Sequence, residues 1–141
     1  MTRTPEEDGI IVIMPVGSDP RQAERRSAVV RGLSGARLKP LLPDYDVADP
    51  QFSLENFLAA LRGARGVLAD LTGERPSSYF ELGVAEALGR PVVLVAETGT
   101  RIHQSSGRPT VRFYSGMDEL ASLIEEAFSP DRAGCARRDG S

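Results

Sequence analysis

One carboxylate occupies a place in the sequence where an apolar side chain is expected. A predicted helix begins near Ser78, and at about 100° per residue its apolar side chains gather into one stripe: Leu82, Val84, Ala85 and Leu88. Glu81 lies at the middle of that stripe, whereas Glu86 projects roughly 140° away, toward water. Because an inward carboxylate costs desolvation energy, Glu81 is the first candidate for chemistry.

A purely structural role accounts for the same glutamate. Ser78-x-x-Glu81 fits a capping box, in which the two residues satisfy each other's backbone N–H groups. An acid in a first helical turn also gains roughly 0.3–1 kcal/mol from the helix dipole. The spacing is compatible with both roles.

Apolar runs and amphipathic segments alternate along the rest of the chain. The runs favour buried parallel strands at residues 10–14, 38–42, 66–71, 91–96 and 111–114. Helices are predicted at residues 19–33, 53–62 and 115–128, besides the one that begins near Ser78. The alternation predicts a single α/β domain, a three-layer flavodoxin- or Rossmann-like fold around a five-stranded parallel sheet. We expect a flexible N-terminus at residues 1–9, the domain at 10–128 and a disordered tail at 129–141.

Two loops should meet at the carboxyl edge of this sheet. In the usual strand order the first and third strands are neighbours, so the loops at residues 15–19 and 70–80 line one crevice. In the first loop, Asp19 is the expected N-cap of the next helix, with Pro20 at its first position and Gln22 in a capping box. The N-terminal ends of the two helices that follow these loops can bind an anion through their backbone N–H groups.

The residues that could contact an anion follow from these two loops. They are Gly17, Ser18, Arg21, Arg25, Ser77 and Ser78, with Arg26 and Arg75 as further arginines. The alternative for each arginine is an ordinary place on a solvated face.

Composition excludes several other classes. The 141 residues have a net charge of -3, which gives no general attraction to nucleic acid or to anionic membranes. Cys135 and His103 are the only cysteine and the only histidine, so no disulfide within the chain, no metal and no other cofactor is expected. The chain has no signal-like apolar core and no membrane-spanning run, which predicts a cytoplasmic protein.

Residues 69–95 carry a recognisable combination of motifs. An Ala-Asp-Leu-Thr strand end is followed by a helix with aromatic-Glu-Leu-Gly-x-Ala and by a Gly-Arg-Pro-Val strand; residues 11–15, Ile-Val-Ile-Met-Pro, agree with a first strand. Together they resemble the nucleoside 2-deoxyribosyltransferase-like superfamily, including its nucleotide N-glycosidase branch. The resemblance covers roughly residues 10–128.

The resemblance implies a function for Glu81. It matches the glutamate that attacks the anomeric carbon and forms a glycosyl-enzyme intermediate, and a carboxylate there stabilises an oxocarbenium-like state. The implied reaction is hydrolysis of a nucleoside 5′-monophosphate to free base and (deoxy)ribose 5-phosphate. A homodimer with a shared active site is also implied, in which Ser105 of a neighbouring subunit completes the pocket.

Three positions depart from that pattern. Phe57 and Arg75 stand where the family has aspartates, and Val12 stands near the place of a tyrosine. Asp70 therefore becomes the candidate general acid or partner of a sugar hydroxyl, or else it caps its own loop.

Two other functions stay open. One is a TIR-like NAD nucleosidase, since that fold also uses a glutamate against a ribosyl–nicotinamide bond. The other is a non-catalytic nucleotide-sensing module, which the changes at Phe57 and Arg75 would allow.

Overall fold

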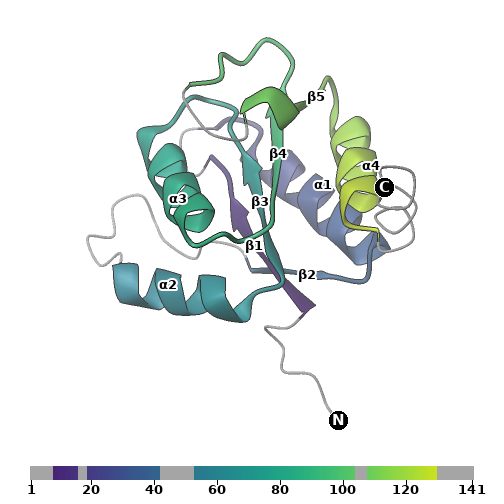
Figure 1. Ribbon diagram of the computed structural model, residues 1–141. Helices are drawn as coiled ribbons and strands as arrows, with labels where there is room; N and C mark the ends of the chain where they lie inside the picture. The colour runs from purple at the N-terminus through teal and green to yellow at the C-terminus, as the bar shows by residue number, and fades with distance from the viewer. Residues whose placement is uncertain (1–7, 16–18, 42–52, 104–107, 130–141) are drawn as a thin grey trace, which may run out of the picture.

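A parallel sheet of five strands forms the centre of the protein (Figure 1). The computed structural model describes residues 8–15, 19–41, 53–103 and 108–129. The strands are β1 (Gly9–Ile13), β2 (Lys39–Leu41), β3 (Gly66–Asp70), β4 (Val92–Glu97) and β5 (Arg112–Tyr114). They pair in parallel in the order β2-β1-β3-β4-β5. Each predicted strand is present, with boundaries shifted by one residue at most ends.

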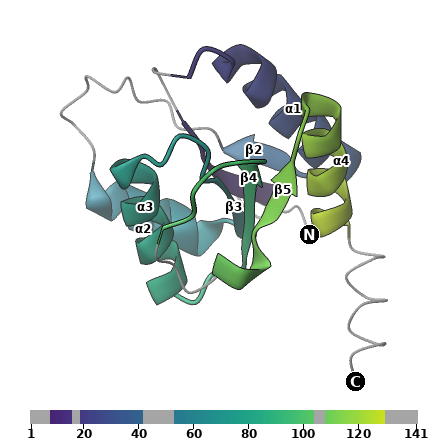
Figure 2. The ribbon, with the colours of Figure 1, turned by 90° about the horizontal axis from the view of Figure 1, so that it is seen from above.

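Four helices cover the two faces of the sheet. They are α1 (Gln22–Gly35), α2 (Leu54–Gly63), α3 (Pro76–Ala87) and α4 (Met117–Phe128), and a 3-10 turn, η2 (Arg108–Thr110), precedes β5. Figure 2 shows α1 and α4 on one face and α2 and α3 on the other. The predicted three-layer, flavodoxin-like α/β domain is confirmed.

The two cores follow from the alternation of side chains along each strand. In β1, Ile10 and Val12 pack under α1 and α4, whereas Ile11 and Ile13 pack under α2 and α3. Because both faces of β1 and β3 are covered, these strands are apolar throughout, as the sequence pattern indicates.

The start of α1 differs from its prediction. Arg21, not Asp19, is the N-cap, and its side chain makes no capping bond. Asp19 instead accepts a hydrogen bond from the backbone N–H of Arg21 at Oδ1 (2.9 Å) and one from Nε of Arg25 at Oδ2 (2.7 Å). The carboxylate of Asp19 thus bonds both a backbone N–H at the start of α1 and the side chain of Arg25.

The start of α3 also differs, and the difference bears on Glu81. Arg75 is the N-cap and Pro76 the first residue of the helix, which suits a ring with a fixed φ and no N–H. Glu81 therefore lies in the second turn, five residues after Pro76. The capping box between Ser78 and Glu81 is absent, because Ser78 is itself inside the helix.

The other two helix starts are close to prediction. Ser53 is the N-cap of α2, and its Oγ accepts from the backbone N–H of Asn56 at 3.2 Å. Gly116 rather than Ser115 is the N-cap of α4, and the hydroxyls of Ser115 and Thr98 lie within hydrogen-bond distance, at 3.1 Å. No helix in the described part of the chain is both long and apolar enough to cross a membrane.

Candidate functional site

The carboxyl edge of the sheet carries the loops that follow β1 and β3. These strands are paired neighbours, and the helices that follow them cover opposite faces. Diverging helices of this kind open the crevice in which α/β sheets bind ligands. Three of the predicted contacts, Gly17, Ser18 and Ser105, lie outside the described residues.

Glu81 is half-buried at the border between two faces of α3. The inward face consists of Ser78, Leu82 and Ala85, so the prediction that Glu81 lies at the middle of the inward stripe is wrong. Leu88, expected on that stripe, is 37% exposed. Apolar residues occupy most of the circumference of α3, so their periodicity could not define a single inward direction.

The carboxyl group of Glu81 is nevertheless held in an unusual environment. Burial raises the pKa of Glu81 to about 7, although the positive charge of Arg75 opposes the rise. A carboxyl group with a pKa near neutrality exchanges readily between its two charge states at physiological pH. Such a group at the carboxyl edge of a parallel sheet is suited to nucleophilic or acid–base chemistry.

The two serines at the start of α3 have different surroundings. Ser77 is exposed at the second position of the helix, where backbone N–H groups point outward. Ser78 is buried, at 4% exposure, and its backbone N–H donates to the carbonyl of Arg75 at 3.1 Å. Of the two, Ser77 is the residue that a ligand can reach.

A buried polar network lies on the other face of the sheet at the same edge. Its centre is Arg25, which is 1% exposed. Nε of Arg25 donates to Asp19 Oδ2 at 2.7 Å, Nη2 donates to Glu97 Oε2 at 3.1 Å, and Nη1 donates to the hydroxyl of Tyr114. Arg25 was predicted to contact a phosphate, but each of its three guanidinium nitrogens donates a hydrogen bond to a protein group. We call this set, with Asp70 and Thr72, the Arg25 network.

Charge and burial act in opposite directions on the groups around Arg25. Burial alone would raise the pKa of Asp19, but the hydrogen bonds from Arg25 and from the Arg21 backbone, together with the positive charges of both arginines, lower that pKa overall. Burial alone would lower the pKa of Arg25, but the hydrogen bond to Asp19 and the electrostatic interactions with Tyr114, Asp70 and Asp19 together raise it. Both groups are therefore held ionised across the neutral range.

Asp70 belongs to this network and is buried, at 1% exposure. Its Oδ2 accepts from the Tyr114 hydroxyl at 2.5 Å, and its Oδ1 accepts from the backbone N–H of Thr72 at 3.0 Å. Burial raises the pKa of Asp70, opposed by its hydrogen bonds with Thr72 and Tyr114. The sequence left Asp70 open as a general acid, as a partner of a sugar hydroxyl or as a cap of its own loop. The bond from the Thr72 N–H is the one expected of a loop cap.

The structure separates Asp70 from Glu81. Asp70 follows Leu68 by two residues in β3, and both side chains point to the face covered by α1 and α4. Glu81 is carried by α3 on the opposite face. Asp70 and Glu81, the two candidate catalytic residues, therefore lie on opposite faces of the sheet.

The remaining predicted arginines lie nearer the surface. Arg21 is half-buried, and its Nη1 lies 3.3 Å from Oε1 of Glu97. Its Nε also approaches Oε2 of Glu24 at 3.5 Å. Arg26 is exposed on α1. Of the two predicted contacts at the start of α1, Arg25 is buried, whereas Arg21 has part of its surface open to solvent.

The positions that depart from the family pattern have structural roles here. Phe57, at 7% exposure, belongs to the core beneath α2 and α3. Val12 belongs to the core on the other face, beneath α1 and α4, and so points away from α3. Arg75 is the N-cap of α3 and the cation that acts on Glu81.

Sequence reasoning missed one group of polar residues, which we call the His103 cluster. Nε2 of His103 lies 2.7 Å from Oε1 of Glu74. The backbone N–H of His103 donates to the hydroxyl of Tyr79 at 2.9 Å, and the two rings meet edge to face at 5.4 Å. Its members come from the loop after β3, the first turn of α3 and the segment after β4. No spacing in the sequence indicates that these three segments meet.

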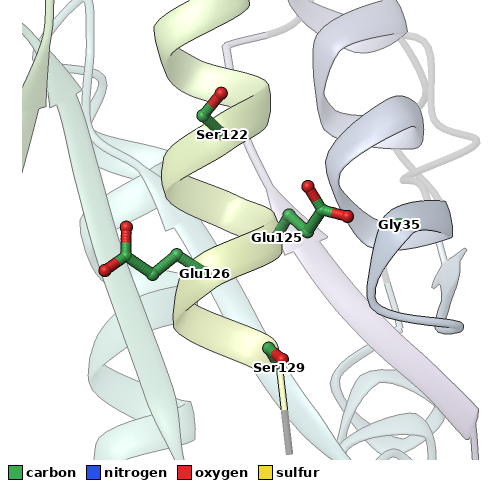
Figure 3. Close-up of a pocket in the computed structure, with 5 residues that line it drawn as sticks. All are labelled: Gly35, Ser122, Glu125, Glu126 and Ser129. Carbon is green, nitrogen blue, oxygen red and sulfur yellow. The ribbon is translucent and has the colours of Figure 1, made fainter. Parts of the chain in front are cut away.

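A surface hollow of about 320 Å³ lies elsewhere, at the C-terminal ends of α1 and α4. Helices run antiparallel to the strands in this fold, so these ends lie away from the carboxyl edge of the sheet. Figure 3 shows Glu125 of α4 pointing toward Gly35 of α1, while Glu126 points away from it. Within the described residues, no group of three or more histidine, cysteine, aspartate or glutamate side chains is placed to hold a metal ion.

The strand order and the helices on both faces define a single flavodoxin-like α/β domain. The chain is similar in structure to the 2-deoxyribosyltransferase of the psychrotolerant bacterium Bacillus psychrosaccharolyticus. The TM-score is 0.59 at 18% sequence identity, over 80% of this chain and 90% of that chain. At this identity the similarity shows a shared fold.

A second solved structure is more distant. The E. coli constitutive lysine decarboxylase matches at a TM-score of 0.48 and 14% identity, over 90% of this chain and 18% of that chain. No protein-family model and no curated protein matches the sequence.

Proposed function

We propose that the protein is a nucleotide N-glycosidase with Glu81 as its nucleophile. The observation that carries the proposal is a half-buried carboxyl group on α3, at the carboxyl edge of the sheet, with a pKa raised to about 7 by burial. The fold that the chain shares with a 2-deoxyribosyltransferase supports an enzyme that acts on an N-glycosyl bond. The motif that contains Glu81 supports the nucleotide N-glycosidase branch.

The reaction takes place in two displacements at the anomeric carbon. In the first, a carboxylate oxygen of Glu81 bonds to C1′ while the C1′–N bond breaks and its electron pair leaves with the base. In the second, a water oxygen bonds to C1′ and the bond to Glu81 breaks, which releases (deoxy)ribose 5-phosphate. Both transition states carry positive charge on the sugar, which a carboxylate stabilises.

The 5′-phosphate binds at the helix starts that face the crevice. Ser77 offers a hydroxyl and the open N-terminus of α3, and Gly17 and Ser18 lie in the loop that leads to α1. Arg21, half-buried at the start of α1, is the arginine that would add a charged contact. Arg25 supports this loop from beneath through its bond to Asp19. At the start of α3, Pro76 has no N–H and those of Ser78 and Tyr79 donate to the carbonyl of Arg75, which leaves the N–H of Ser77 for the phosphate.

The active site lies next to a surface suited to a second subunit. The outward face of α3 carries Phe80, at 54% exposure, with Gly83, Ala87 and Leu88 at helical spacing. Glu81 borders this face, so a copy of the chain packed on it would exclude water from the carboxyl group. A homodimer in which the partner's Ser105 completes the pocket is consistent with this position.

Chromatography of a panel of nucleoside monophosphates and NAD after incubation tests the function. We expect the native protein to release free base from at least one monophosphate, and Glu81→Gln to release none. Cleavage of NAD alone would favour the NAD nucleosidase. No base release by the native protein, together with binding of a nucleotide, would favour the sensing module.

A further inference from the structure

Glu97, the last residue of β4, contacts a different arginine with each oxygen of its carboxylate. Oε2 accepts from Nη2 of Arg25 at 3.1 Å, and Oε1 lies 3.3 Å from Nη1 of Arg21. Both arginines lie at the start of α1, the helix that follows β1, and β3 separates β1 from β4 in the sheet. Glu97 therefore reaches across one strand to the helix start at which the proposed function places an arginine contact with phosphate.

The two arginine contacts of Glu97 differ in their surroundings. The contact with Arg25 lies beside the 2.7 Å ion pair between Arg25 and Asp19, in which both side chains are buried. In the contact with Arg21, the arginine side chain is 41% exposed and the glutamate side chain 30%. An ion pair that is open to water contributes little to stability, because solvent screens it. Arg21 is thus the partner that can leave Glu97 while the Arg25 network stays in place.

Glu97 itself stays fixed when Arg21 leaves. Its backbone N–H donates to Oγ1 of Thr72 at 2.8 Å, and its Oε2 keeps the bond from Arg25. Its Oε1 therefore remains at a set place beside the start of α1. The second carboxylate near Arg21 differs, since Glu24 has a side chain that is 65% exposed, and its Oε2 lies 3.5 Å from Nε of Arg21.

We propose that Glu97 competes with the phosphate of the substrate for Arg21 and so sets the affinity of the protein for phosphate. This inference rests on the proposed function, in which Arg21 contacts the 5′-phosphate, and it extends that function. In the free protein Arg21 pairs with Oε1 of Glu97. When a phosphate binds, the arginine side chain turns from that oxygen to the phosphate oxygens.

A phosphate monoester is the stronger partner for the guanidinium group. It carries a charge of about −1.5 to −2 at neutral pH and three strong acceptor oxygens, and it can accept two parallel N–H bonds from one arginine. Glu97 offers Arg21 a single oxygen, because its other oxygen is bonded to Arg25. The exchange from Glu97 to phosphate is therefore favourable, but its free energy is reduced by the loss of the pair.

The pairing has a consequence for substrate selectivity. Every phosphate that binds through Arg21 has to replace the contact with Glu97, so the observed dissociation constant is larger than that of an unpaired Arg21. For an exposed ion pair the factor is up to about 5. A nucleoside without a phosphate makes no use of Arg21, so Glu97 does not alter its binding. Glu97 thus lowers the preference of the protein for nucleotides over nucleosides.

Titration calorimetry with inorganic phosphate tests the proposal without any need for catalysis. We expect Glu97→Gln to lower the dissociation constant for phosphate by about 3–5-fold relative to the native protein. The amide oxygen can still accept from Nη2 of Arg25, so the fold is retained. On the nucleotide that the native protein cleaves, KM should fall by a similar factor with little change in kcat, because the phosphate contact is the same in the ground state and the transition state.

Glu24→Gln is the matched control, since it removes the same charge from the other side of Arg21. Because Glu24 is exposed and is not held in place, the dissociation constant should change by less than about 2-fold. Arg21→Gln supplies a second control. In that background the further change Glu97→Gln should also have an effect of less than about 2-fold, because the guanidinium group for which Glu97 competes is gone.

An unchanged dissociation constant in Glu97→Gln would overturn the proposal. So would equal gains in affinity in Glu97→Gln and Glu24→Gln, which would identify a general effect of charge, or a gain that persists in the Arg21→Gln background. Absence of phosphate binding in both the native protein and Glu97→Gln would overturn it as well. Phosphate binding that follows the expected pattern, without release of base from any monophosphate, would contradict the N-glycosidase function and support the role of Glu97.

Discussion

The hydroxyl of Tyr114, at the end of β5, donates a hydrogen bond to Oδ2 of Asp70, at the end of β3, over 2.5 Å. The same hydroxyl accepts a hydrogen bond from Nη1 of Arg25 on α1. One buried oxygen thus joins a helix to two strands that β4 separates in the sheet. The carboxyl edge that carries the candidate site is held together beneath its loops by this atom.

Tyr114→Phe should therefore destabilise the protein. The change leaves Asp70 and Arg25 each without one buried hydrogen bond, at a cost of about 1–3 kcal/mol in the free energy of unfolding. Chemical denaturation of the two proteins measures the difference. Phe113→Leu, at the neighbouring residue with 45% exposure, is the control and should change stability by less than about 0.5 kcal/mol. Equal stability of native protein and Tyr114→Phe would show that the hydroxyl is dispensable.

Glu81→Gln should stabilise the protein at alkaline pH while it abolishes activity. The folded-state pKa is raised from 4.5 to about 7, so the folded protein binds more protons than the unfolded chain between these values. Native stability then falls as pH rises through that window, and the glutamine variant escapes the fall. After allowance for solvent screening, we expect a gain of about 1–2 kcal/mol at pH 8 and none below pH 4. Parallel pH–stability curves for the two proteins would contradict this.

Gly32→Ala should weaken the packing of α1 against α4. A Cβ at this position would lie 2.7 Å from the Ala121 carbonyl oxygen and 2.7 Å from the Ile124 Cβ, so the backbones would have to separate. We expect a loss of about 1–3 kcal/mol by thermal or chemical unfolding.

Gly35→Ala is the matched control for that change, one turn further along the same helix. The atoms nearest to its Cβ would be those of the Glu125 side chain, and that exposed side chain can rotate away (Figure 3). The better helix propensity of alanine then offsets most of the cost, and stability should change by less than about 1 kcal/mol. Equal losses of stability in Gly32→Ala and Gly35→Ala would mean that the packing of α1 against α4 does not depend on close backbone contact at Gly32.

Phe80→Glu should dissociate the proposed homodimer. The change puts a charge at the centre of the apolar face of α3, where an interface would have to desolvate it. Sedimentation or light scattering should then give the mass of one chain. Leu54→Glu, a similarly exposed apolar residue on α2, should leave the mass unchanged. A monomeric native protein with full activity would remove both the dimer and the partner's Ser105 from the site.

The sequence predicted the frame of the site and could not predict its polar partners. Strands such as the one predicted at residues 66–71 can be recognised in the sequence, because a strand buried on both faces needs apolar residues throughout. Helix starts were harder to predict: the Asp19 carboxylate accepts from the Arg21 backbone N–H as well as from Arg25, and the helix begins only at Gln22. A local pattern could not reveal the bond to Arg25, because Arg25 approaches Asp19 only when α1 is folded.

By itself, the sequence determined the parallel sheet, its order of strands and helices, and the position of Glu81 on the helix after β3. Those features depend on the periodicity of neighbouring residues, which any folded state must respect. Tertiary structure alone decided that Asp70 joins Arg25 and Tyr114, and that His103 joins Glu74. These side chains come from elements distant in the chain, and only the packing of the elements sets which polar groups meet.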